Sequence, residues 1–108
     1  MRAAMFSALG EPNRLQIVEL LGSSSLAVGE ITEALRLRQP QVSKHLKVLA
    51  ESGIVSAEPR GRQRIYQLQA APFHEIVHWV DSFDHLWDVR LSSLGDYLQS
   101  SKIKEDES

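Results

Sequence analysis

Basic side chains are concentrated in one stretch of the chain, from Arg36 to Arg64. The stretch holds seven lysines and arginines and two acidic residues, a formal charge of +5. The rest of the chain carries five basic and twelve acidic residues, a charge of −7. A positive segment in a chain whose net charge is −2 indicates one surface that attracts phosphate groups while the others repel them. This stretch is therefore a candidate for contact with nucleic acid.

Polar side chains on a helix predicted over residues 39–52 could read base edges. Val42, Leu46 and Leu49 are spaced at i, i+4 and i+7, so they share the inward face of this helix. Glutamine pairs with adenine edges, serine and histidine bond bases or phosphates, and lysine suits guanine or phosphate. The outward set predicted to contact DNA is Gln39, Gln41, Ser43, Lys44, His45 and Lys47.

Three arginines cluster in a hairpin predicted to follow this helix. Residues 54–58 and 63–68 have the composition of strands, and Pro59-Arg60-Gly61-Arg62 is predicted as the turn between them. Arg60, Arg62 and Arg64 would bring this hairpin to the DNA backbone or into the minor groove. A merely solvated basic helix and hairpin is the alternative, but solvated surfaces normally mix charges of both signs.

The elements that position these groups are mostly helical. Helices are predicted over residues 3–9, from Pro12, over 29–35, over 39–52 and, for about seven turns, over 73–99. The fold class is thus mainly α with a small β-hairpin, in the order α-α-α-α-β-β-α, a winged helix-turn-helix. We expect one DNA-binding and dimerisation domain over residues 1–99 and a polar, disordered tail over residues 100–108.

Arg14 is placed unusually by this scheme. It lies just inside the start of the second predicted helix, where a cation gains nothing from the helix dipole. Contact with a phosphate and a surface ion pair remain equal alternatives for its side chain.

Several motifs resemble the ArsR-type (ArsR/SmtB) family of winged-helix transcription regulators. They are FSALGEPNR at residues 6–14, VGEI at 28–31, QVSKHLKVL at 41–49, SGIV at 52–55 and GRQRIY at 61–66. None would suffice alone, but together they are specific, and the similarity extends over about residues 5–98.

The resemblance implies a symmetric homodimer that binds an imperfect palindromic operator in double-stranded DNA and usually represses transcription. It implies DNA contacts by Gln41, Ser43, Lys44, His45, Lys47 and the hairpin arginines. It also implies that the first and last helices form the dimer interface. The candidate interface residues are Met5, Phe6, Phe83, Trp87, Leu91 and Leu94.

The chain has no cysteine, which excludes the thiolate sites through which many members of this family sense arsenic, cadmium or lead. The last helix offers another candidate metal site: His74, His78, Asp81, His85 and Asp88 are spaced 4, 3, 4 and 3 and form one stripe on a continuous helix. Histidine and aspartate at i and i+4 can ligate zinc or nickel when a second segment completes the site. We prefer the alternative, a polar outer face of an amphipathic helix, and expect no cofactor.

Other signals could control DNA binding. Histidines beside acidic residues can titrate near neutral pH. The aromatic residues Trp79, Phe83, Trp87 and Tyr97 could line a small-molecule pocket, although such a stripe is more often core or dimer seam. An unidentified effector or protein partner is a further alternative.

An enzyme is not expected, because the sequence has no nucleophile with a supporting base, no glycine-rich phosphate loop and no cofactor motif. A protein-interaction module that kept the fold and lost DNA binding is a second alternative. The complete polar set on the predicted recognition helix argues against it. No stretch is predicted as a signal peptide or membrane span, so we expect a cytoplasmic protein with no membrane partner.

Overall fold

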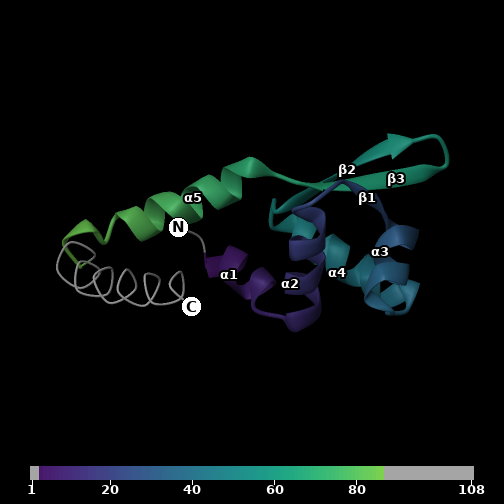
Figure 1. The fold of residues 1–108 in the computed structure, drawn as a ribbon, viewed down its shortest axis with the longest axis horizontal. Coiled ribbons are helices and arrows are strands. Elements are labelled where there is room, and N and C mark those ends of the chain that lie inside the picture. The colour runs from purple at the N-terminus through teal and green to yellow at the C-terminus, as the bar shows by residue number, and fades with distance from the viewer. Residues whose placement is uncertain (1–2, 87–108) are drawn as a thin grey trace, which may run out of the picture. The chain divides into compact units, whose positions relative to one another are not determined.

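The computed structural model describes residues 3–86. Its elements are α1 (Ala3–Leu9), α2 (Pro12–Leu21), β1 (Leu26–Ala27), α3 (Val28–Leu35), α4 (Gln39–Glu51), β2 (Val55–Arg60), β3 (Gln63–Leu68) and α5 (Ala70–Asp81) (Figure 1). The chain divides into two compact units after Ile76, and the first contains every element except the end of α5. No helix among residues 3–86 is long and apolar enough to cross a membrane.

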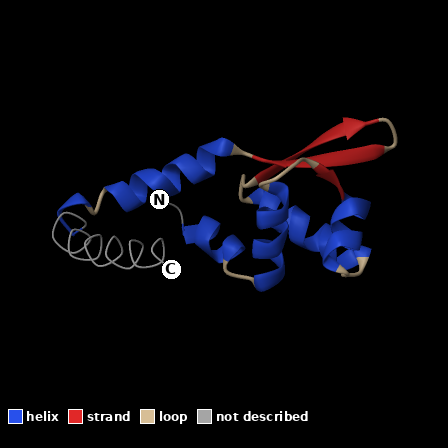
Figure 2. Ribbon diagram, viewed as in Figure 1, coloured by secondary structure: helices blue, strands red, loops and turns tan. Residues whose placement is uncertain are grey.

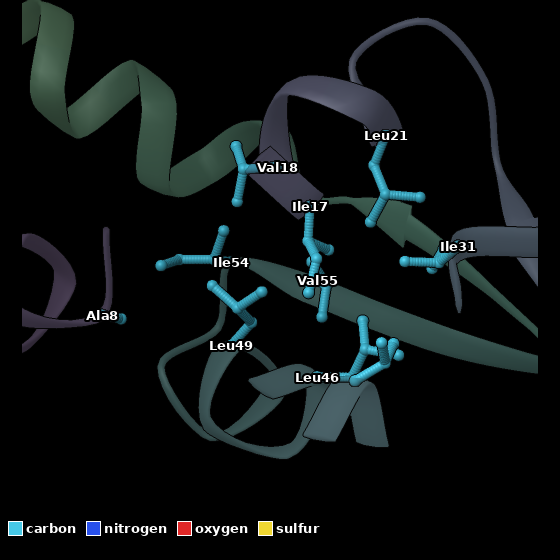
Figure 3. Packing of buried hydrophobic residues seen from close by; sticks show 10 residues of the cluster. Ala8, Ile17, Val18, Leu21, Ile31, Leu46, Leu49, Ile54 and Val55 are labelled. Carbon is cyan, nitrogen blue, oxygen red and sulfur yellow. The ribbon is translucent and has the colours of Figure 1, made fainter. Parts of the chain in front are cut away.

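The core confirms the periodicity predicted for α4. Val42, Leu46 and Leu49 are each 0% exposed. They pack in one cluster with buried residues of α2, α3 and the start of β2 (Figure 3). This cluster holds the helix-turn-helix together, because burying aliphatic side chains of this size stabilises a fold by about 1.5–3 kcal/mol each.

The end of α4 follows from the glycine after it. Gly53 has a φ of +76°, the left-handed conformation in which glycine carries no Cβ penalty. The backbone N–H of Gly53 donates to the carbonyl of Ala50 (3.0 Å), and that of Ile54 donates to the carbonyl of Leu49 (2.9 Å). This is the Schellman pattern of helix ends, and Leu49 and Ile54 bury the apolar contact that often accompanies it. The glycine predicted to stop α4 therefore does so.

The sheet has three antiparallel strands in the order β1-β3-β2, one more than the predicted hairpin (Figure 2). The extra strand, β1, pairs Leu26 with Tyr66 and Ala27 with Ile65. The hairpin itself is longer than predicted, because β2 continues through Pro59 and Arg60, which pair with Arg64 and Gln63. Proline is tolerated in β2 because this strand lies at the edge of the sheet.

The hairpin turn is consequently shorter than the predicted four residues. Only Gly61 and Arg62 stand between the paired residues Arg60 and Gln63. Gly61 has a φ of +65°, as two-residue hairpin turns require at their first central position.

The prediction of one continuous helix over residues 73–99 is wrong. Helix α5 begins three residues earlier, at Ala70, and ends at Asp81; a turn occupies residues 82–83 before helical structure resumes at residue 84. The side-chain hydroxyl of Ser82 donates to the carbonyl of Trp79 (2.5 Å), and the backbone N–H of Phe83 donates to the carbonyl of Val80 (3.2 Å). These shorter-range bonds compete with the regular helical pattern and interrupt it.

Candidate nucleic-acid interface

The turn between α3 and α4 places the two helices of the helix-turn-helix. Arg36 ends α3 in the left-handed conformation (φ +55°), and its backbone N–H donates to the carbonyl of Thr32. Two residues later, the backbone N–H of Arg38 donates to Oε1 of Gln41 (3.4 Å), which caps the start of α4. Since a residue other than glycine is strained at positive φ, the surrounding packing must enforce this tight turn.

Most of the predicted DNA-contacting residues of α4 are exposed. They are Gln39, Gln41, Ser43, Lys44 and Lys47. The side chain of Gln41 is also part of the cap of its own helix, so its amide oxygen already has a partner. The structure thus leaves a polar and basic surface on α4 opposite the buried aliphatic face.

The hairpin lies against this surface and forms two hollows with it. The first hollow, of about 330 Å³, is lined by Ala27, Val28, Gly29, Gln39, Ser43, Arg62, Gln63, Arg64 and Tyr66. The second hollow, of about 340 Å³, is lined by Ser43, Leu46, Lys47, Ala50, Glu51, Ala57, Arg64 and Tyr66. The structure therefore brings Arg62 and Arg64 together with α4, whereas Arg60 is exposed but lines neither hollow.

His45 is less exposed than the other residues of α4 predicted to contact DNA. Its side chain is only 19% exposed, and its Nδ1 lies 3.7 Å from Oε2 of Glu11, at the start of α2. The grouping of His45 with the exposed residues in one outward set did not anticipate this burial, which depends on a residue outside α4.

Glu11 is held by the start of its own helix. Its Oε2 accepts a hydrogen bond from the backbone N–H of Arg14 (2.9 Å), so Glu11 is the N-cap of α2. This bond is the main cause that lowers the pKa of the Glu11 carboxyl; burial opposes it, and a hydrogen bond from the backbone of Asn13 adds to it. The carboxylate is therefore anionic at neutral pH.

The side chain of Arg14 binds backbone carbonyls of α1. Its Nε donates to the carbonyl of Ala8 (2.6 Å), and one Nη donates to the carbonyl of Ser7 (3.2 Å). Both carbonyls belong to the last turn of α1, where backbone oxygens have no partner within the helix. Arg14 thus joins the end of α1 to the start of α2.

The residues predicted for a dimer interface differ in their exposure. Met5 is buried within the protomer (4% exposed), whereas Phe6 and Phe83 are 42% and 40% exposed. Trp87, Leu91 and Leu94 lie outside the described residues. Exposed apolar side chains also occur along the end of α5 and just after it, at Val77, Trp79, Val80 and Leu86.

The predicted histidine and aspartate stripe is interrupted. His74, His78 and Asp81 are exposed on α5, but His85 follows the turn at residues 82–83, and Asp88 lies outside the described residues. Among residues 3–86, no three histidine, aspartate or glutamate side chains gather closely enough to hold a metal ion.

Comparison with known proteins places this geometry in one family. The family model described as "Bacterial regulatory protein, arsR family" matches residues 11–57. The HTH-type transcriptional regulator Rv2034 of Mycobacterium tuberculosis is 44% identical over 95 residues, which cover 88% of this chain and 86% of that protein. The HTH-type transcriptional repressor SmtB of the same organism is 40% identical over 76 residues, 70% of this chain and 54% of the repressor.

A solved structure shares the fold. The homodimeric winged helix-turn-helix DNA-binding domain of Mb0332 from Mycobacterium bovis, a possible ArsR-family transcriptional regulator, superposes with a TM-score of 0.64 at 26% identity over 77% of each chain. The resemblance stated from the motifs is confirmed. The chain belongs to the ArsR (ArsR/SmtB) family of winged helix-turn-helix, DNA-binding transcription regulators.

Proposed function

We propose that this protein represses transcription by binding an imperfect palindromic operator as a homodimer. The observation that supports it most is the joint surface of α4 and the hairpin, where Ser43 and Arg64 line both hollows. A helix with exposed polar side chains fits the major groove, and a basic hairpin beside it can reach the adjacent backbone or minor groove.

The residues of this surface divide into two roles. Gln39, Gln41, Ser43 and Lys44, in the first half of α4, would meet base edges, as the first residues of recognition helices do. Lys47 and the three hairpin arginines, Arg60, Arg62 and Arg64, would contact phosphates or the minor groove. The first set would select the sequence, and the second would supply affinity for any DNA.

In a homodimer, the second protomer would present the same surface to the DNA, related to the first by two-fold symmetry. Dimeric helix-turn-helix proteins bind half-sites about 10–10.5 base pairs apart, or multiples of this, because the symmetry of the protein matches that of the operator. Phe6 and Phe83 are large apolar side chains on the surface of the protomer. They would form the interface together with Trp87, Leu91 and Leu94, and residues 1–99 would act as one DNA-binding and dimerisation domain. We infer no catalytic role for this protein. We also propose that it acts in the cytoplasm.

The experiment is a titration of the metal-stripped protein against DNA from its own promoter and against a scrambled duplex of the same length. We expect the promoter to bind at least about 10³-fold more tightly, the lower end of specific recognition. Equal affinity for the two duplexes would overturn the proposal. Zinc or nickel should leave the promoter affinity unchanged, and a His78→Ala variant should behave like the wild type under both conditions.

A further inference from the structure

The contact between Glu11 and His45 gives one residue of α4 a role different from its neighbours. We infer that Glu11 positions the recognition helix through His45, and that His45 does not read DNA. This inference rests on the operator binding proposed above and assigns to its site a positioning pair.

The partial burial of His45 supports the inference. Its side chain is only 19% exposed, and that of Glu11 is 32% exposed. The other residues of α4 predicted to contact DNA are exposed. An imidazole covered to this extent is poorly placed to reach a base edge.

Glu11 is suited to act as an anchor, because the same oxygen has two partners. Its Oε2 accepts the Arg14 backbone N–H at 2.9 Å and lies 3.7 Å from His45 Nδ1. The first bond fixes the carboxylate at the N-terminus of α2, where the helix dipole also stabilises a negative charge. The carboxylate can therefore attract His45 without moving, and the attraction restrains the flank of α4.

This restraint adds to what the core provides. Val42, Leu46 and Leu49 fix the face of α4 that points inward. A contact on the flank opposes rotation of the helix about its own axis, a motion to which Gln39 and Ser43 would be sensitive. Displacement of reading side chains by a fraction of an ångström weakens hydrogen bonds to bases, because their geometry is narrow.

The two ring nitrogens of His45 allow a matched pair of variants. Asparagine carries its amide nitrogen where Nδ1 stands, so His45→Asn keeps a donor toward Glu11. Glutamine carries its amide nearer the position of Nε2, so His45→Gln keeps a polar group on the far side of the ring. A positioning role predicts that His45→Asn retains promoter affinity within about twofold and that His45→Gln loses about as much as His45→Ala, on the order of tenfold.

The second measurement is a double-variant cycle on promoter DNA with Glu11→Gln, His45→Ala and both together. We expect each single variant to lose promoter affinity by about fivefold to tenfold. The double variant should bind no more weakly than the weaker-binding single variant, since both substitutions remove the same interaction. Glu19→Gln, which removes an exposed carboxylate from the same helix, is the control and should bind like the wild type. The salt dependence of binding should be unchanged in all of them, because no phosphate contact is lost.

The outcomes separate the two proposals. If the wild type shows no preference for the promoter, both the operator function and the positioning role fail. If the wild type prefers the promoter but the losses of Glu11→Gln and His45→Ala multiply, or His45→Gln rescues where His45→Asn does not, only the positioning role is overturned. Thermal melts of each variant distinguish these results from unfolding, since a folded variant must retain a cooperative transition.

Discussion

Ser43 on α4 and Arg64 on β3 line the same two hollows, so the recognition helix and the hairpin share one surface at these residues. Arg60, four residues before Arg64 along the hairpin, lines neither hollow. The three hairpin arginines are therefore not equivalent in position, although their sequence spacing makes them look alike.

This difference leads to a prediction for the hairpin. Arg64→Ala should weaken promoter binding by about tenfold, the lower range for losing a hydrogen bond to a charged group. Arg60→Ala, the matched control with the same loss of charge, should weaken it by less. Fluorescence anisotropy at one fixed salt concentration would measure both, and equal losses would show that only the charge of the hairpin matters.

Lys47 should act on all DNA sequences alike. It is exposed on α4 and lines the second hollow beside Arg64. Lys47→Ala should weaken binding to promoter and scrambled DNA by the same factor and reduce the slope of log affinity against log salt by about one. A salt titration of both duplexes measures this slope, and an unchanged value would contradict a phosphate contact.

Arg14 should matter for stability rather than for DNA. Its guanidinium donates to the carbonyls of Ser7 and Ala8 at the end of α1. Arg14→Ala should lower the free energy of unfolding by about 1 kcal/mol, the typical net contribution of a hydrogen bond, chiefly through the part-buried carbonyl of Ala8, since the carbonyl of Ser7 still accepts the backbone N–H of Gly10. Arg14→Lys should recover only part of this loss, because an ammonium lacks the planar fork that reaches two carbonyls. Urea denaturation measures all three proteins, and full recovery in Arg14→Lys would argue against the two-carbonyl contact.

The lowered pKa of Glu11 predicts how stability depends on pH. A carboxyl whose pKa is lower in the folded than in the unfolded state stabilises the fold above the unfolded value, about 4.5. This contribution is lost as the pH falls through the folded value. Glu11→Gln should therefore be less stable than the wild type at pH 7, and the difference should shrink as the pH falls below about 4. Thermal melts across this range test the prediction, and a difference that is constant with pH would contradict it.

Local periodicity predicted the parts of the fold that depend on neighbours in sequence. The buried face of α4 and the stop at Gly53 both follow from residues within a few positions of each other. The strand β1 could not be recognised as part of the sheet, because it has two residues and its partner in β3 lies about forty positions away. The end of α5 was missed since Ser82 is an ordinary residue on a helix surface until its hydroxyl is seen to bond the carbonyl of Trp79.

The candidate site shows the same division. Exposure of Gln39, Ser43, Lys44 and Lys47 follows from the core pattern of α4, which the sequence contains. The partial burial of His45 and its contact with Glu11 could not be predicted in this way, because Glu11 lies at the start of another helix.

Strand β1 has a consequence for how the protein meets DNA. It ends immediately before α3, and it pairs with β3 of the hairpin. Strand pairing therefore ties the hairpin to the residue immediately before the first helix of the helix-turn-helix, which restrains tilting of one against the other. The entropy of aligning them is lost when the chain folds and not when it binds, so the protein arrives at the duplex preorganised.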